Sequence, residues 1–210
     1  MKDKGKTYYI VTLVFHDQAR PIDDGLKVLD RELSLLNCPK GAVHTEPLIR
    51  REAPYEAFTP NERRAIFTKL FFFAKKSDIL YRSFIFEKQQ FNDEMKLEAR
   101  ISRDISQFLR DKMSFFNGFD EIVLYYDNGQ KQLSRILNSV LATEFVNYDV
   151  RKVSPSDYRL FQVADLICTI ELFNIKCETG IQMTKSEEYI FHSKREFKKD
   201  FVKSLLSKRL

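Results

Sequence analysis

Hydrophobic and polar positions follow two kinds of pattern along the chain. Runs rich in β-branched and aromatic residues are typical of strands, and they occur at 7–15, 79–87, 121–126 and 144–150. Elsewhere apolar residues recur at steps of three and four, which favours amphipathic helices. These steps predict helices at 22–36, 60–75, 90–114 and 129–142, a fifth beginning near Ser154, and a last one at about 185–207.

Two helix starts carry a specific signature. Thr59 stands before Pro60 and three residues before Glu62, an arrangement typical of an N-cap, a first-turn proline and a capping box. Ser154 and Pro155 repeat the pattern of a cap followed by proline at the first helical position. The sequence therefore predicts helix starts at Pro60 and Pro155.

Strands interleaved with helices predict an α/β fold. We expect a sheet with helices on its faces, with at least one parallel pairing made through a crossover. The 210 residues suit one sizeable domain spanning 1–210, and the six glycines and six prolines argue for dense regular structure.

Composition indicates the cellular location of the protein and the partners that it could bind. No run approaches the roughly 20 apolar residues of a membrane span, and the opening MKDKGK lacks the apolar region of a secretory signal. We therefore expect a cytoplasmic protein without a membrane partner. Three cysteines without metal-type spacing indicate free thiols. The net charge of +5 is compatible with a nucleic-acid partner, DNA or RNA.

One acid interrupts an apolar helix in RLFQVADLICTIELF. Gln162, Asp165 and Thr169 line a narrow polar stripe on a segment that is otherwise apolar on nearly all sides. A buried carboxylate is costly unless a cation, a hydrogen-bond network or a metal compensates it. A structural ion pair between Asp165 and an Arg or Lys is the alternative to a functional role.

A second acid follows the strand in EIVLYYDNGQ. The apolar run predicts a buried strand that ends in Asp127, at the edge where open α/β sheets bind ligands. Ordinary turn chemistry is the alternative, since Asp-Asn-Gly is also a common turn. Together, Asp127 and Asp165 could hold Mg²⁺ or Mn²⁺, which prefer carboxylate oxygens and support attack on a phosphodiester.

Further charged residues suit the edge of such a site. The stretch VHTEPLIRREAPY at 43–55 predicts a loop with His44 as proton shuttle or metal neighbour and Arg50 as phosphate contact. A solvated, self-paired loop is the alternative. Lys88, just after the second strand run, is either a capping cation or a phosphate contact.

The last predicted helix is strongly basic. Residues 185–210 contain eight Lys and Arg against four Asp and Glu, which leaves +4. Phe191, Phe197, Phe201 and Leu205 lie among these charges. One face could therefore dock while the other meets phosphate, although a solvated amphipathic helix is the plain alternative.

Several segments together resemble a known family. YYIVTLVFHDQ, HTEPLIRREAPY, NERRAIFTKLF, LYYDNGQ and FQVADL are similar, over residues 7 to 175, to the bacterial domain-of-unknown-function family thirty-eight hundred, whose fold is ribonuclease H-like. The resemblance implies a mixed sheet flanked by helices and acids that hold Mg²⁺. By position, Asp127 and Asp165 match the family's acids and Gln162 matches its glutamine.

The family pattern also has a first strand carrying Asp-Glu-Ser, which this sequence lacks. Only MKDKGK precedes Thr7, and Asp3 in that charged stub does not stand in for the missing acid. Either upstream residues encode the strand, which we expect, or the protein has lost cleavage and keeps binding. The chain as it stands is expected to have weak activity or none.

Two hypotheses follow. The first is a ribonuclease H-like, divalent-metal-dependent nuclease or phosphodiester hydrolase, with Asp127, Asp165 and His44 catalytic and with Gln162, Arg50 and Lys88 contacting substrate. The second is a non-catalytic nucleic-acid-binding or partner-binding module of a mobile-element or phage-defence system. The sequence leaves open the choice among DNA, RNA and nucleotide, and the oligomeric state.

Overall fold

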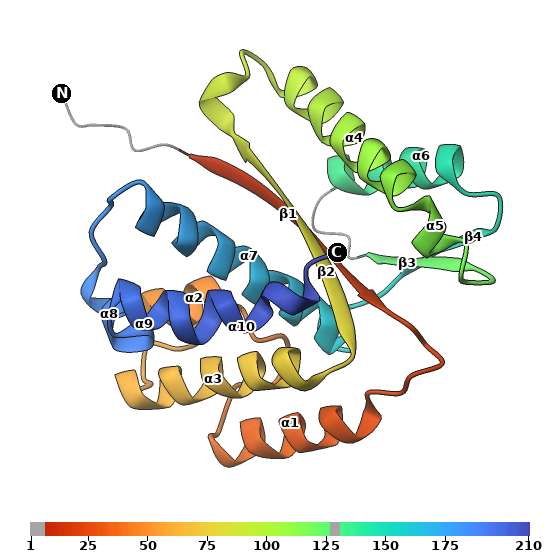
Figure 1. The fold of residues 1–210 in the computed structure, drawn as a ribbon. Helices are drawn as coiled ribbons and strands as arrows, with labels where there is room; N and C mark the ends of the chain where they lie inside the picture. The colour runs from red at the N-terminus through yellow and green to blue at the C-terminus, as the bar shows by residue number, and fades with distance from the viewer. Residues whose placement is uncertain (1–6, 127–130) are drawn as a thin grey trace. The chain divides into compact units, whose positions relative to one another are not determined.

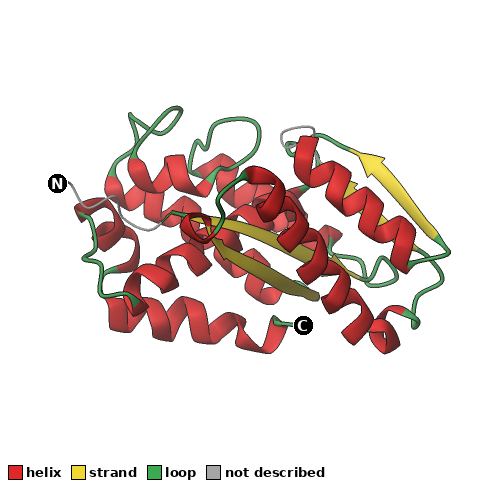
Figure 2. Ribbon diagram, turned by 90° about the horizontal axis from the view of Figure 1, so that it is seen from above, coloured by secondary structure: helices red, strands yellow, loops and turns green. Residues whose placement is uncertain are grey.

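The computed structural model describes residues 7–126 and 131–210 of the chain. Helices and short strands make up a mixed α/β protein (Figure 1, Figure 2), so the predicted class is confirmed. The backbone contacts divide the chain into two compact units. Unit 1 comprises Met1–Ile10 and Phe84–Ser154, and unit 2 comprises Val11–Ser83 and Pro155–Leu210. This division of backbone contacts does not test whether residues 1–210 form a single domain, so that statement stays a prediction.

Two long strands, β1 (Tyr8–His16) and β2 (Ile79–Glu87), pair with each other. The Lys88 amide donates to the Thr7 carbonyl at 2.8 Å, and the Thr12 and Ser83 hydroxyl oxygens lie 2.8 Å apart. Rising numbers along β1 thus meet falling numbers along β2, so the pair is antiparallel. Both strands lie within one residue of the predicted runs.

Most of unit 2 is helical. Its first long helix is α1 (Asp23–Leu35), and the short α2 (Thr45–Arg50) follows within the stretch predicted to be a loop. The longest helices of unit 2 are α3 (Pro60–Lys76) and α7 (Arg159–Glu178). At the start of α3 the predicted capping box is present, because the Thr59 hydroxyl accepts from the Glu62 amide and the Glu62 carboxylate accepts from the Thr59 amide.

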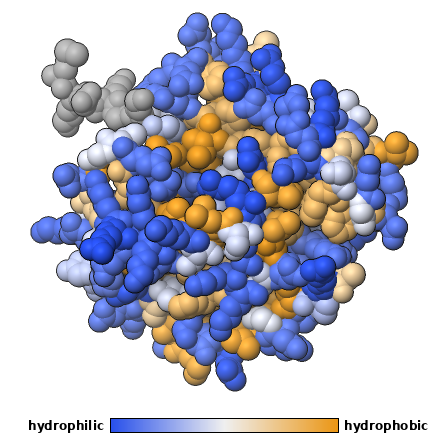
Figure 3. All heavy atoms as spheres, viewed as in Figure 1, coloured by the Kyte–Doolittle hydropathy of each residue, from blue (hydrophilic) through white to orange (hydrophobic). Residues whose placement is uncertain are grey.

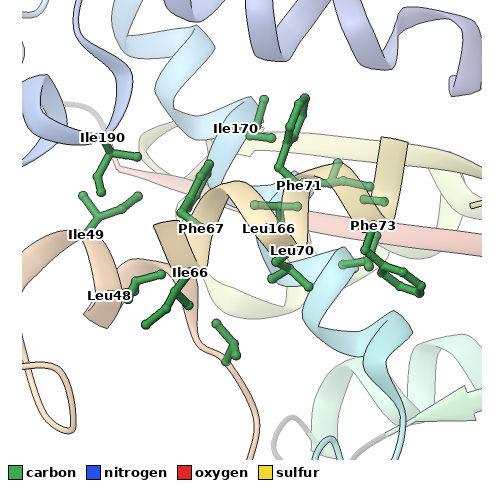
Figure 4. Packing of buried hydrophobic residues seen from close by; sticks show 14 of the residues in the cluster. Leu48, Ile49, Ile66, Phe67, Leu70, Phe71, Phe73, Leu166, Ile170 and Ile190 are labelled. Carbon is green, nitrogen blue, oxygen red and sulfur yellow. The ribbon is translucent and has the colours of Figure 1, made fainter. Parts of the chain in front are cut away.

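The core of unit 2 forms where α2, α3, α7 and α8 (Lys185–Phe191) meet. Figure 4 shows side chains from these four helices directed toward one another. The cluster contains Leu48 and Ile49 of α2, Ile66, Phe67 and Leu70 of α3, Leu166 and Ile170 of α7, and Ile190 of α8. Removing this apolar surface from water is the main stabilising term for unit 2.

The predicted helix at about 185–207 is broken, so that expectation is wrong. The segment contains α8, then α9 (Lys194–Phe197), a π-helical stretch (Lys198–Val202), α10 (Lys203–Leu205) and a short turn of 3₁₀ helix. The break occurs because His192 has a φ of 61° and the Ser193 hydroxyl accepts from the Glu196 amide at 3.2 Å, which begins a new helix. Of the predicted docking face, Phe191, Phe197 and Leu205 are buried and Phe201 is half-buried.

The end of the chain lies along β2. The Leu210 amide donates to the Tyr81 carbonyl at 2.9 Å, and Lys208 Nζ donates to the Ser77 carbonyl. Arg209 forms an ion pair with the buried Glu171 carboxylate of α7. The C-terminal segment is thereby bound to both β2 and α7.

Unit 1 contains the parallel pairing that the sequence predicts. Strand β3 (Ile122–Tyr126) leads through α6 (Lys131–Glu144) to β4 (Tyr148–Lys152), and the two strands pair in parallel with Ile122 opposite Tyr148. The predicted helix at 90–114 is α4 (Glu94–Asp111) followed by the short α5 (Met113–Phe116). Rings from β2, α4, α5 and the segments after α5 and α6 pack edge to face; they are Phe84, Phe108, Phe115, Phe116, Phe119 and Phe145.

Other expectations need correction. Strand β3 is half-buried along its length rather than buried, because it pairs only with β4 in the part of the chain that the structure describes. The fifth helix begins at Arg159, since residues 155–157 form a turn, and the fourth strand begins at Tyr148 because α6 continues to Glu144. The described strands form two two-stranded sheets, so a ribonuclease H-like sheet stays a prediction.

Over the same described residues, no helix has the length and apolar character to cross a membrane.

Replacing Phe197 by Ala tests the core. The Phe197 side chain is 0% exposed and packs against Phe173 and Phe191, so we expect the free energy of unfolding to fall by about 3–5 kcal/mol. Urea unfolding followed by circular dichroism measures the change. The matched control is Phe72→Ala, at a position 46% exposed, and an equal effect of both substitutions would contradict the assigned core.

Candidate functional site

The acid of α7 has its main partner in α2. Asp165 Oδ2 accepts hydrogen bonds from the Thr45 amide at 2.8 Å and from the Thr45 hydroxyl at 3.0 Å. Thr45 is 0% exposed, whereas Asp165 is half-buried. The amide of Thr45 is one of those at the start of α2 that have no partner within the helix, so Asp165 satisfies it and places negative charge at the positive helix end.

A second threonine completes this contact. Thr169 Oγ1, one turn after Asp165 on α7, lies 2.6 Å from Thr45 Oγ1. The single hydroxyl proton of Thr45 is directed to the charged carboxylate, where the hydrogen bond is stronger. Thr169 therefore donates to Thr45, and the two threonines and Asp165 form one chain of hydrogen bonds.

This arrangement answers why the apolar helix carries an acid. No Lys or Arg forms an ion pair with Asp165 in the described part of the chain, so the structural ion pair is not the explanation. A hydrogen-bond network compensates the carboxylate instead. That network uses only Oδ2, and no hydrogen bond from the described residues reaches Oδ1.

The described residues alone do not form a metal centre. Within 7–126 and 131–210, no group of three or more His, Cys, Asp or Glu side chains is placed to hold an ion. Asp127, the predicted second ligand, lies outside the described residues. Asp165 Oδ1 is the one free carboxylate oxygen of this network, so binding of Mg²⁺ or Mn²⁺ stays a prediction.

His44 lies beside the network in the chain. It is the N-cap residue of α2, with an extended backbone, and its carbonyl accepts from the Leu48 amide at 3.2 Å. Its side chain is exposed. Because Thr45 follows at once, the segment that carries His44 is held at α7 by the contact between Thr45 and Asp165.

Tyr55 is a buried ionisable residue whose pKa is affected by the charge of Asp165. It is 1% exposed, and burial raises its pKa to about 12. Repulsion between a tyrosinate and the Cys38 thiolate or the Asp165 carboxylate adds to the rise, while a hydrogen bond with the His44 backbone opposes it. Tyr55 is therefore neutral at physiological pH.

Gln162 has a different set of partners from Asp165. It is 2% exposed, its Oε1 accepts from Arg159 Nη1 at 2.9 Å, and its Nε2 donates to the Pro155 carbonyl at 3.3 Å. The same guanidinium pairs with Asp30 of α1 at 2.8 Å. Gln162 therefore orients Arg159 at the start of α7, and the polar stripe predicted from the sequence divides into two separate networks.

Arg159 lines a surface pocket that the sequence reasoning missed. The pocket has a volume of about 420 Å³, and its wall comes from α1, the segment 37–43 and Arg159. The Cys38 thiol lies there, and burial raises its pKa although the nearby Arg159 lowers it. The only sign of this pocket in the sequence was an arginine, Arg159, three residues before the glutamine. The partners of Arg159, Asp30 and Gly41, are more than 100 residues away in the chain, so the pocket could not be inferred from it.

The two residues predicted to contact phosphate, Arg50 and Lys88, are surface residues. Arg50 ends α2 and forms exposed ion pairs with Glu46 and Glu52, as in the self-paired alternative, and such pairs contribute little to stability. Lys88 belongs to unit 1, where its ammonium lies 5.8 Å from the centre of the Tyr9 ring. Their roles as phosphate contacts stay predictions.

Comparison with known proteins adds no relative. No protein-family model matches the chain, and neither a curated protein nor a solved structure matches it. The resemblance to a ribonuclease H-like family therefore rests on the quoted motifs alone.

The raised pKa of Tyr55 predicts a pH dependence. Between pH 10 and about pH 12 an unfolded tyrosine loses its proton while Tyr55 keeps it, so the folded state binds more protons and stability falls as pH rises. The contribution is fully present below pH 10 and has decreased by about 2 kcal/mol at pH 12.

Urea unfolding at pH 9 to 12, in wild type and Tyr55→Phe, measures this difference. The variant should lose stability less steeply, whereas Tyr189→Phe, at an exposed position, should follow the wild type. Parallel curves for wild type and Tyr55→Phe would show that the pKa of Tyr55 is not raised.

Proposed function

We propose that the protein is a divalent-metal-dependent nuclease or phosphodiester hydrolase of ribonuclease H-like type, with Asp165 as a carboxylate ligand of Mg²⁺ or Mn²⁺. The observation that supports it best is the asymmetry of the Asp165 carboxylate. One oxygen is held by Thr45 and the other has no hydrogen bond from the described residues. A carboxylate fixed through one oxygen holds the other in a set direction. Side chains that bind metals are usually oriented by hydrogen bonds in this way.

The surrounding residues have supporting roles in this proposal. Thr45 is a positioning residue because it holds Asp165, and Thr169 supports this contact through its hydrogen bond with Thr45. His44 has an exposed side chain next to Thr45, which suits exchange of a proton with a water or a leaving group. Asp127 keeps its proposed role as the second acid. When bound, the ion would supply Lewis-acid chemistry at the phosphodiester.

Cleavage assays test this function. Labelled DNA and RNA panels are incubated with Mn²⁺ and wild type, Asp165→Asn or Asp127→Asn. Loss of a ligand charge should lower the cleavage rate by more than about 100-fold. Asparagine keeps an oxygen that can accept from Thr45, so unit 2 should stay folded in Asp165→Asn. The control is Asp24→Asn, an exposed acid on α1, and equal rates in all four proteins would remove both acids from the mechanism.

A second candidate function is nucleic-acid binding without cleavage, and one observation favours it. Arg195, Lys198, Lys199 and Lys203 are exposed on the segment from α9 to α10, and no ion pair within 4.0 Å involves any of them in the described structure. Figure 3, drawn in the view of Figure 1, has hydrophilic side chains gathered over α8 and α9. Phe197 and Leu205 anchor the other side of this segment in the core.

Charge removal tests this second candidate better than deletion, because deleting 185–210 would also remove the buried Phe191, Phe197 and Leu205. In EDTA, Lys198→Gln with Lys199→Gln should weaken binding to a DNA duplex. The slope of log K against log salt should fall by about 2, because each phosphate that is no longer neutralised accounts for about one unit. Fluorescence anisotropy at several salt concentrations gives both values.

The matched control is Lys75→Gln with Lys76→Gln, which removes two exposed adjacent charges from the end of α3. If both double variants bind alike, net charge rather than this surface governs binding.

A further inference from the structure

A second pocket lies in unit 1, at the start of α4. Its volume is about 310 Å³, and its lining residues are Phe91, Lys96, Ala99, Arg100 and Arg103. The three cations follow one another at steps of four and three residues, so they lie on one face of α4. Phe91 precedes the helix, and Asp93 caps it by accepting from the Lys96 amide at 2.7 Å. Aromatic and cationic groups are therefore brought together by a single well-capped helix.

The cations of this pocket are available to an anion. Arg103 is exposed and has no ion pair within 4.0 Å among the residues described. Arg100 pairs with Asp104 at 2.8 Å, and Lys96 lies 3.9 Å from Asp93. Both pairs lie at the surface, where water and salt screen them, so a phosphate can replace either carboxylate at little cost.

The ring of Phe91 differs from six other phenylalanines of unit 1. Phe84, Phe108, Phe115, Phe116, Phe119 and Phe145 pack against one another. Phe91 is half-buried and takes part in no ring contact among the described residues. The small side chain of Ala99 is exposed in the same pocket. An unpartnered ring beside a small residue leaves space for another flat group.

We propose that this pocket binds one nucleotide of single-stranded nucleic acid, with the base stacked on Phe91 and the neighbouring phosphates held by Arg103, Arg100 and Lys96. Every base has a π-face, but duplex bases are already stacked on each other, so an aromatic platform selects single strands. An acidic peptide would use the cations and leave the ring unused. This inference deepens the proposed function by naming its substrate class, and it rests on that function only for cleavage.

Binding measured without metal tests the site separately from cleavage. Fluorescence anisotropy with a labelled 12-nucleotide oligothymidylate in EDTA compares wild type with Phe91→Leu and Arg103→Ala. Each substitution should weaken binding about tenfold. Arg103→Ala should also lower the salt slope by about 0.7, whereas Phe91→Leu should leave the slope unchanged. Phe91→Tyr, which keeps a ring, should retain wild-type affinity.

Matched controls are Phe72→Leu and Arg31→Ala, which remove an exposed ring and an exposed charge from unit 2, and both should bind like the wild type. A 12-base-pair duplex should bind Phe91→Leu as it binds wild type. Circular dichroism and the melting temperature establish that each variant is folded.

Three results would overturn the site: no binding of the oligonucleotide by wild type, unchanged affinity in Phe91→Leu, or displacement by polyglutamate as effective as by unlabelled oligonucleotide. The two proposals fail in different ways. Cleavage by wild type with unchanged binding by Phe91→Leu leaves the nuclease and removes the pocket. Ring-dependent binding without any cleavage by wild type leaves the pocket and removes cleavage as an activity of this chain.

Discussion

The contact between the Asp165 carboxylate and Thr45 is the interaction on which the arrangement of unit 2 depends. It joins α7 to α2 across 120 residues of sequence, and it satisfies both the amide and the hydroxyl of a fully buried threonine. Each buried donor without a partner would cost about 1–3 kcal/mol, which would offset much of the stabilisation from burying Leu48 and Ile49 of α2. With the contact in place, α2 can present Leu48 and Ile49 to the same core that α3 and α7 build.

The same contact would allow the Asp165 side chain to have both a structural and a chemical role. A carboxylate has two oxygens, and here the fold uses one of them. Tyr55 is buried and neutral, while His44 remains exposed at the N-cap of α2. Such a site would be positioned by buried residues and would be reached from the surface. Substitutions in the network should therefore affect folding through Oδ2 of Asp165 and chemistry through Oδ1.

The sequence predicted what depends on local pattern. The strand runs, α1, α3 and its capping box follow from spacing and from residues within one turn. Helix α2 was missed because its six residues depend on Asp165, far away in the chain. The break after α8 was readable, since Ser193 and Glu196 have cap spacing, but the apolar rhythm runs through it. The acid at 165 was identified correctly as needing a partner, whereas its partner Thr45 could not be inferred without the fold.

The discontinuity of unit 2 has a consequence for biosynthesis. Its core combines residues from Val11–Ser83 with residues from Pro155–Leu210, whereas nearly all of unit 1 comes from the continuous stretch Phe84–Ser154. During translation, unit 1 has all of its α4, α6 and β4 partners long before Phe191, Phe197 and Leu205 leave the ribosome. The nascent chain must therefore carry the exposed apolar faces of α3 and β2 through most of its synthesis, a period in which chaperones have a ready target.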